Sequence, residues 1–175
     1  MPIVKEINFD GYRFRSKIEA KWYVFFKTLG LDVHYEPETI SLELLDGKLT
    51  NYLVDYYLPD LDAYIEIKLD KNPTVEESMK CFLLSQQTGK DVFLFYETIG
   101  KKNTNGYKYC GDSGAFVPQQ MWTQCPKCST FGITYRGFVA ELSCGCCREM
   151  GDLTNSESFA IQEAVKAVRG ERFGA

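Results

Sequence analysis

Two neighbouring segments of the sequence carry charged side chains among apolar and aromatic ones. The first, YLVDYYL (52–58), contains Asp55, and the second, AYIEIKL (63–69), contains Glu66 and Lys68. Because strand side chains alternate between faces, Glu66 and Lys68 share one face. Two neighbouring carboxylates repel unless a cation joins them or one binds a proton, and hard divalent cations prefer such oxygen ligands. A lysine beside them can stabilise developing negative charge, so the pattern indicates phosphodiester hydrolysis.

The turn between these two segments decides which aspartate accompanies Glu66. Asp55 and Glu66 both lie five or six residues from a turn centred near residue 60, so an antiparallel pair of strands brings them together. Asp60 and Asp62 lie in the turn itself, where aspartate is ordinary turn chemistry. We therefore expect Asp55 to lie beside Glu66. The competing interpretation is that Glu66 and Lys68 form a surface ion pair on an edge strand.

Glu19 has two interpretations, which the sequence leaves open. The apolar spacing over residues 15–29 predicts a helix, and Ser16 is a suitable N-cap. Glu19 follows three residues later and completes the pattern of a capping box. An acid at the start of a helix that packs over the sheet could also supply a third carboxylate to the site.

The remaining pattern predicts an α/β core with a mixed sheet. An aspartate–glycine turn at 46–47 predicts a hairpin, and residues 73–88 predict a second helix that begins with a capping-box pattern. After residue 100 the composition changes to cysteines, glycines and aromatic residues. The other expected elements are strands over 33–36, 39–45, 52–58, 63–69 and 92–96, and a C-terminal helix over about 156–173.

The cysteines indicate a structural zinc site. Cys125-Pro-Lys-Cys128 is followed by Cys144-Gly-Cys146-Cys147, with a hairpin-like segment between them. This spacing is typical of a zinc ribbon with four thiolate ligands. Cys125, Cys128 and Cys144 belong to either form of that site. The fourth ligand is Cys147 in the usual knuckle, with Cys146 as the alternative.

The net charge of −4 is unevenly distributed. Residues 32–77 hold twelve Asp and Glu but three Lys and Arg, which is unusual for a nucleic-acid binder unless the acids hold divalent cations that bridge to phosphate. The C-terminal helix carries Lys166, Arg169 and Arg172 on its polar side and is expected to dock on the core. No run approaches the length of a membrane span, and residues 1–17 lack the apolar core of a signal peptide. We expect a cytoplasmic protein without a membrane partner.

Together, the segments FRSKIEAKW, YEPE, YLVDYYLPDLDAYIEIKLDKNPTVEESMK and TGKDVFLFY resemble the PD-(D/E)XK nuclease superfamily. The resemblance covers roughly residues 9–97. This part of the sequence is particularly similar to the catalytic core of phage junction-resolving endonucleases and related transposon-end nucleases. It implies a restriction-endonuclease-like mixed sheet flanked by helices, and a metal-dependent DNA endonuclease. One departure is Val54, where the family motif has proline. The implied catalytic residues are Glu19, Asp55, Glu66 and Lys68, with Asp55 and Glu66 as ligands of Mg²⁺ or Mn²⁺.

The expected organisation is a nuclease-like core over 1–100, a zinc-ribbon lobe over 101–150 and a C-terminal helix over 151–175. The expected function is a Mg²⁺-dependent endodeoxyribonuclease that acts on branched or replicating phage DNA in the cytoplasm of a bacterial host. The alternative is a catalytically inactive relative that binds nucleic acid or a protein partner. A zinc-ribbon adaptor would explain residues 101–150 alone. The sequence does not decide whether the substrate is DNA or RNA, or which structure the substrate has. It also leaves the oligomeric state open, although symmetrical cleavage of a junction would require a homodimer.

Overall fold

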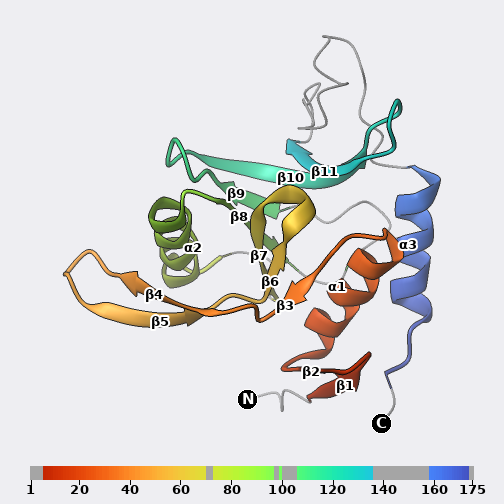
Figure 1. Ribbon diagram of the computed structural model, residues 1–175, viewed down its shortest axis with the longest axis horizontal. Helices are drawn as coiled ribbons and strands as arrows, with labels where there is room; N and C mark the ends of the chain where they lie inside the picture. Colours follow the sequence, from red (N-terminus) through yellow and green to blue (C-terminus); the bar gives the residue numbers. More distant parts are fainter. Residues whose placement is uncertain (1–5, 70–72, 97–98, 100–105, 136–157, 174–175) are drawn as a thin grey trace.

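The computed structural model describes residues 6–69, 73–96, 99, 106–135 and 158–173. These residues form a mixed α/β fold with a large mixed sheet, as the sequence predicted (Figure 1). The elements are β1 (Ile7–Phe9), β2 (Tyr12–Phe14), α1 (Lys17–Thr28), β3 (His34–Tyr35), β4 (Thr39–Glu43), β5 (Leu49–Leu53), β6 (Tyr56–Leu58), the 3₁₀ turn Pro59–Leu61, β7 (Ala63–Lys68), α2 (Val75–Thr88), β8 (Asp91–Tyr96), β9 (Gly106–Tyr109), β10 (Phe116–Gln124), β11 (Phe131–Tyr135) and α3 (Phe159–Gly170).

The large sheet has the strand order β11-β10-β9-β8-β7-β6-β3. Its central pair, β7 and β8, is parallel, and α2 forms the crossover between these two strands. A parallel pair needs such a crossover, whereas antiparallel neighbours can be joined by a tight turn. The other pairs in the sheet are antiparallel. Strands β1 and β2 form one separate hairpin, and β4 and β5 form another.

Helices cover both faces of the large sheet. In Figure 1, α1 and α3 lie side by side, and α2 lies on the other side of the sheet. The alternation of β7 explains the two layers, because Ile65 and Ile67 belong to the core under α1, whereas Tyr64 belongs to the core under α2. Helix α3 buries an apolar stripe against this body, as predicted for the C-terminal helix. The stripe consists of Ile161, Ala164, Val165 and Val168.

Helices α1 and α2 begin where the sequence predicted. Ser16 caps α1 and accepts a hydrogen bond from the Glu19 N–H. Thr74 caps α2, and its reciprocal bonds with Glu77 complete a capping box. Gly89 ends α2 in the left-handed conformation at φ 70°, which glycine adopts without the steric cost of a Cβ.

The predicted strand over 52–58 is two strands in the structure. The chain leaves β5, which pairs only with β4, and enters β6, which pairs with β3 and β7. Val54 and Asp55 form the break between them. Sequence alternation did not indicate this break, because both halves are apolar and extended. Because of the break, the Asp55 N–H is not part of a strand ladder. This N–H donates instead to the side chain of Glu66 on β7.

Residues 106–135, predicted as part of a zinc-ribbon lobe, continue the sheet of the core. Strand β9 pairs with β8, β10 pairs with β9, and β11 pairs with β10. Strands β8 and β9 pack closely at Gly106, where a Cβ would lie 2.6 Å from the ring of Phe95. Trp122 of β10 is fully buried in the core with Phe25 and Phe26 of α1. This part of the chain is therefore integrated with residues 6–96.

Candidate active site

Asp55 and Glu66 meet at the break between β5 and β6. Tyr56 lies opposite Ile65 in the β6–β7 register, which places Asp55 next to the position of Glu66. The Asp55 N–H donates to Glu66 Oε2 at 3.3 Å, and the Ile67 N–H donates to Asp55 Oδ2 at 2.7 Å. The two side chains are only 2% and 3% exposed. The predicted pairing of strands therefore brings the two carboxyl groups into one buried site.

Two cationic side chains border these carboxylates. Lys68 Nζ donates to Glu66 Oε1 from the same face of β7, and its side chain is 31% exposed. Arg15, in the residues just before α1, donates from Nη2 to Asp55 Oδ1 at 2.7 Å. The Arg15 Nε group forms an ion pair with Glu36. Arg15 is half exposed, so one side of its guanidinium faces the carboxylates and the other faces solvent.

Glu19 lies at the same site and is also part of the helix start. Its Oε1 accepts a hydrogen bond from the Ser16 hydroxyl at 2.6 Å, and its Oε2 accepts one from the Tyr35 hydroxyl at 2.6 Å. The carboxyl group is 7% exposed and acts electrostatically on Asp55. The predicted capping box is therefore half formed: Ser16 accepts from the Glu19 N–H, but the Glu19 carboxylate binds the Ser16 hydroxyl, whereas the full reciprocal box occurs at Thr74 and Glu77 of α2. The same carboxylate thus belongs to the helix start and to the site.

Burial raises the pKa of Asp55 well above its usual value, and the negative charge of Glu66 raises it further. Lys68 and the Ile67 N–H oppose this shift. The pKa of Lys68 is itself raised: burial acts to lower it, but the attraction of Glu66 and Asp55 prevails. Arg15 follows the same pattern, with its pKa raised by Asp55 against burial. Protonation of Asp55 is thus one way to relieve the repulsion between the acids.

A divalent cation would be the other way, although the described residues contain no group of three or more His, Cys, Asp or Glu side chains placed to hold a metal ion. Carboxylate oxygens at a buried position are the ligands that Mg²⁺ and Mn²⁺ prefer. Four carboxylates and two cationic side chains leave the cluster with a formal charge of −2, which one divalent cation would balance. The members of this cluster are Glu19, Glu36, Asp55, Glu66, Arg15 and Lys68.

The two turn aspartates lie apart from this cluster and have other partners. Asp60 accepts a hydrogen bond from the Asp32 N–H at 2.8 Å. Asp62 accepts one from the Tyr57 hydroxyl at 2.6 Å and forms an ion pair with Lys90. Both therefore serve the surface of the turn, as ordinary turn chemistry predicts.

The sequence analysis missed Arg15 and Tyr35. Arg15 immediately precedes the helix N-cap, so its place near Glu19 could have been noticed, but its bond to Asp55 joins residues 40 positions apart. Tyr35 could not be singled out among the many tyrosines. Its hydroxyl donates to Glu19 and accepts from the Arg15 N–H at 3.0 Å, so it fixes the start of α1 against the sheet.

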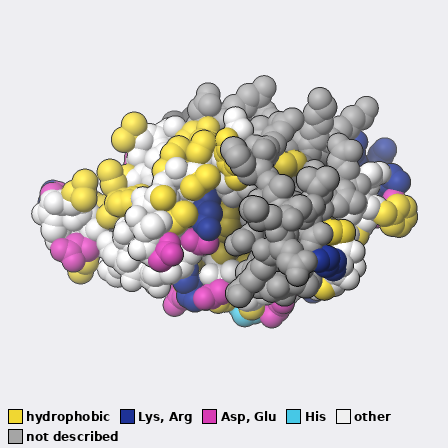
Figure 2. Space-filling model, turned by 90° about the horizontal axis from the view of Figure 1, so that it is seen from above, with side chains coloured by type: hydrophobic (Ala, Val, Ile, Leu, Met, Phe, Trp, Pro, Cys, Tyr) yellow, Lys and Arg dark blue, Asp and Glu magenta, His cyan; other side chains and the backbone are white. Residues whose placement is uncertain are grey.

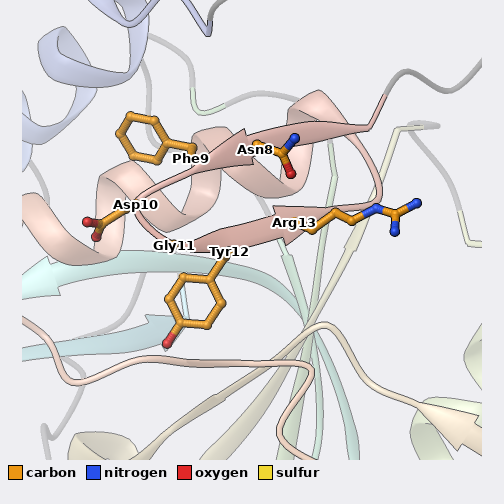
Figure 3. Close-up of a pocket in the computed structure, with 6 residues that line it drawn as sticks. All are labelled: Asn8, Phe9, Asp10, Gly11, Tyr12 and Arg13. Atoms are coloured by element: carbon orange, nitrogen blue, oxygen red, sulfur yellow. The ribbon is translucent and has the colours of Figure 1, made fainter.

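A shallow surface pocket, which we call the hollow, lies at the β1–β2 hairpin, away from Asp55 and Glu66. Figure 3 shows the side chains around it, which come from residues 8–13. Its charged groups already have partners: Asp10 accepts from the Tyr23 hydroxyl at 2.7 Å, and Arg13 pairs with Glu6 at 2.5 Å. The hollow brings no group of carboxylates together and carries no candidate chemistry.

Cys125 and Cys128 occupy the turn between β10 and β11. The Cys128 N–H points to Cys125 Sγ at 3.5 Å, and Ser129 takes a left-handed conformation at φ 63°. The Cys125 N–H donates to the Thr130 carbonyl at 2.8 Å and closes the turn. Both sulfur atoms are thus held on one tight turn. The other predicted ligands, Cys144, Cys146 and Cys147, lie outside the described residues.

Comparisons with known proteins give no relative for this chain: no family model, curated protein or solved structure matches it. In the described residues, no helix is long and apolar enough to cross a membrane.

Proposed function

We propose that this protein is a metal-dependent DNA endonuclease with a restriction-endonuclease-like core of the PD-(D/E)XK type. The observation that carries the proposal is the buried Asp55–Glu66 pair with Lys68 on the same face. Three elements converge there, namely the start of α1, the β5–β6 break and β7, and the bond from Arg15 to Asp55 spans 40 positions of the chain. Buried carboxylates are costly to assemble, so a site of this kind favours a chemical role over a structural one.

Each residue has a role that follows from its position. Asp55 and Glu66 would hold Mg²⁺ or Mn²⁺, which supplies Lewis acidity and lowers the pKa of a bound water. Lys68, partly exposed beside Glu66, would stabilise negative charge that develops on the phosphate. Glu19, fixed by the hydroxyls of Ser16 and Tyr35, adds a third negative charge near the cation.

Arg15 would compete with the metal for Asp55, because its guanidinium is bound to that carboxylate. Arg15→Gln is therefore expected to tighten Mn²⁺ binding to the DNA-free protein by about two- to fivefold, the range for a half-exposed ion pair. Calorimetric titration measures this directly. Arg13→Gln is the matched control, since Arg13 pairs with Glu6 on the exposed β1–β2 hairpin. Weaker Mn²⁺ binding by Arg15→Gln would contradict the competition.

The test of the proposal is incubation with labelled junction, duplex and single-stranded DNA in Mg²⁺, in Mn²⁺ and in EDTA. Cleavage that requires the cation supports the proposal, and the preferred substrate identifies the DNA structure. A labelled RNA of the same sequence decides between the two nucleic acids. A junction cut symmetrically on both strands would further indicate two copies acting together.

One observation favours the alternative, a catalytically inactive protein that binds nucleic acid or a protein partner. Each carboxylate oxygen of Asp55 and Glu66 already has a donor within the protein, from Arg15, Ile67, Lys68 or Asp55 itself. Such a network can be purely structural. Failure to cleave every substrate in the panel, together with no Mn²⁺ binding in the calorimeter, would favour this alternative.

We further propose a structural zinc ion bound by Cys125, Cys128, Cys144 and either Cys147 or Cys146. The tight turn that holds Cys125 and Cys128 supports this proposal. We expect one zinc per chain by metal analysis, with loss of the zinc by Cys125→Ser. Because β9 and β10 are part of the core sheet, chelation is expected to leave the Trp122 fluorescence close to native while it disorders the Cys125–Cys128 turn. A stable, zinc-free native preparation would contradict the proposal.

A further inference from the structure

Aromatic side chains form a row across the sheet that begins beside the candidate active site. Tyr96 on β8 is the cross-strand partner of Lys68. The rings of Tyr96 and Tyr107 meet edge to face with centroids 5.5 Å apart. The rings of Tyr107 and Phe116 are stacked, with centroids 5.2 Å apart and planes inclined by 18°. We call Tyr96, Tyr107 and Phe116 the aromatic row.

The aromatic row shares the face of the sheet that carries Glu66 and Lys68. The registers show this, because Glu66 lies opposite Leu94 and Leu94 lies opposite Tyr107. Phe116 continues the row on β10, where its side chain also contacts the ring of Tyr109. Strands lie about 4.8 Å apart, so three strand spacings, roughly 14 Å, separate β7 from β10. A few nucleotides of an extended strand span that distance.

The outer part of the row is open to solvent. Tyr96 is buried at 4% exposed, Tyr107 is half-buried, and Phe116 is 52% exposed. Figure 2, which looks down on the β9–β10 side of the molecule, shows hydrophobic side chains gathered on the described part of that face. An exposed phenylalanine stacked on a tyrosine presents a flat apolar ring to a ligand. The Tyr96 hydroxyl has no hydrogen-bond partner among the described residues.

We propose that the aromatic row is a stacking platform for unpaired bases of the nucleic acid strand whose phosphodiester reaches Asp55, Glu66 and Lys68. This inference rests on the proposed function and adds a substrate class to it: single-stranded DNA, or branched DNA with an unpaired segment. Bases within a duplex are already stacked on each other, so only unpaired bases offer their faces to Tyr107 and Phe116.

The charges around the row support contact with bases over contact with phosphates. Glu77, at the start of α2, lies close enough to Tyr96 to act on it electrostatically, and the adjacent Glu76 is paired with Lys80. A negative charge at Glu77 repels a phosphate group, but stacking on an aromatic ring depends little on charge. Base stacking is also tolerant of sequence, because every base has an aromatic face. The row therefore fits a nuclease that recognises unpaired structure rather than a base sequence.

The test compares two oligonucleotides that have the same phosphates: oligothymidylate and an abasic oligomer of equal length. Binding is measured by fluorescence anisotropy in EDTA, so that cleavage plays no part. The native protein is expected to bind oligothymidylate roughly 5- to 150-fold more tightly, as expected for one stacked base. Phe116→Leu keeps an apolar side chain but removes the ring, and it is expected to lose most of this preference.

Phe159→Leu is the matched control, because it is the same substitution at another exposed phenylalanine, which lies on α3 and is 77% exposed. It is expected to keep the native preference. Equal affinity of the native protein for the two oligomers would overturn the inference, even if the protein cleaves DNA. A preference that survives both Phe116→Leu and Tyr107→Leu would overturn it as well.

The result can be separated from the proposed function. Cation-dependent cleavage without a preference for bases would refute the platform alone. A base preference that Phe116→Leu removes, without any cleavage, would refute the nuclease proposal and keep the platform. If Phe116→Leu instead dissociates a dimer and changes no DNA affinity, the row is an interface between copies of the chain, and the inference is wrong.

Discussion

Asp55→Asn is expected to reduce cleavage by roughly 10³-fold or more, since a bound metal ion contributes several kcal/mol to the stabilisation of the transition state. Asparagine has nearly the volume of aspartate but lacks the negative charge that a cation requires. Its side-chain oxygen can still accept the hydrogen bond from the Ile67 N–H. The rate of cleavage of the preferred DNA in Mg²⁺ and Mn²⁺ measures the effect.

The same variant is expected to be more stable than the native protein without metal. The pKa of Asp55 is raised in the folded state, so folding favours its protonated form. The contribution of Asp55 to stability is therefore fully present at a pH below its unfolded pKa of about 3.9, and it is lost as the pH rises through its folded pKa. Asp55→Asn avoids that loss. Its melting temperature in EDTA should exceed the native one at neutral pH, and the difference should vanish near pH 4.

Asp60→Asn is the matched control for both measurements. Asp60 lies five residues further along the chain, in the turn before β7, and bonds the Asp32 N–H. We expect near-native cleavage and no gain in stability from its replacement. The site assignment would be refuted by active Asp55→Asn protein or by a loss of activity confined to Asp60→Asn.

Glu19→Gln is expected to leave the melting temperature near the native value while the rate in Mg²⁺ falls by orders of magnitude. Glutamine can still form hydrogen bonds with the Ser16 and Tyr35 hydroxyls and can complete a cap. It brings no charge to a cation. Loss of a helix cap would cost only about 0.5–2 kcal/mol of stability, so stability and rate distinguish the two roles.

Glu77→Gln provides the comparison for the cap, because Glu77 occupies the corresponding position in the capping box of α2. Its effect on melting shows what this substitution costs at a helix start in this protein. Unchanged cleavage by Glu19→Gln would limit Glu19 to the cap and leave Asp55, Glu66 and Lys68 as the site.

The sequence alone determined the local elements of this protein and the identity of the acidic pair. Caps at Ser16 and Thr74 marked the helix starts, because capping depends on residues three positions apart. The alternation of β7 placed Glu66 and Lys68 on one face, and the length of the turn selected Asp55 over Asp60. These features depend on short spacings along the chain, which a sequence displays directly.

The tertiary structure decided what joins these elements over long distances. It split the predicted strand at Val54–Asp55, because β5 and β6 pair with different partners. It brought Arg15 to Asp55 across 40 positions, and it attached β9 to β8, where the sequence indicated a separate lobe. Strand partners depend on which apolar faces can be buried together, and burial is a property of the assembled core rather than of any local pattern. For that reason the aromatic row, whose residues come from three strands, could be recognised only once the sheet was assembled.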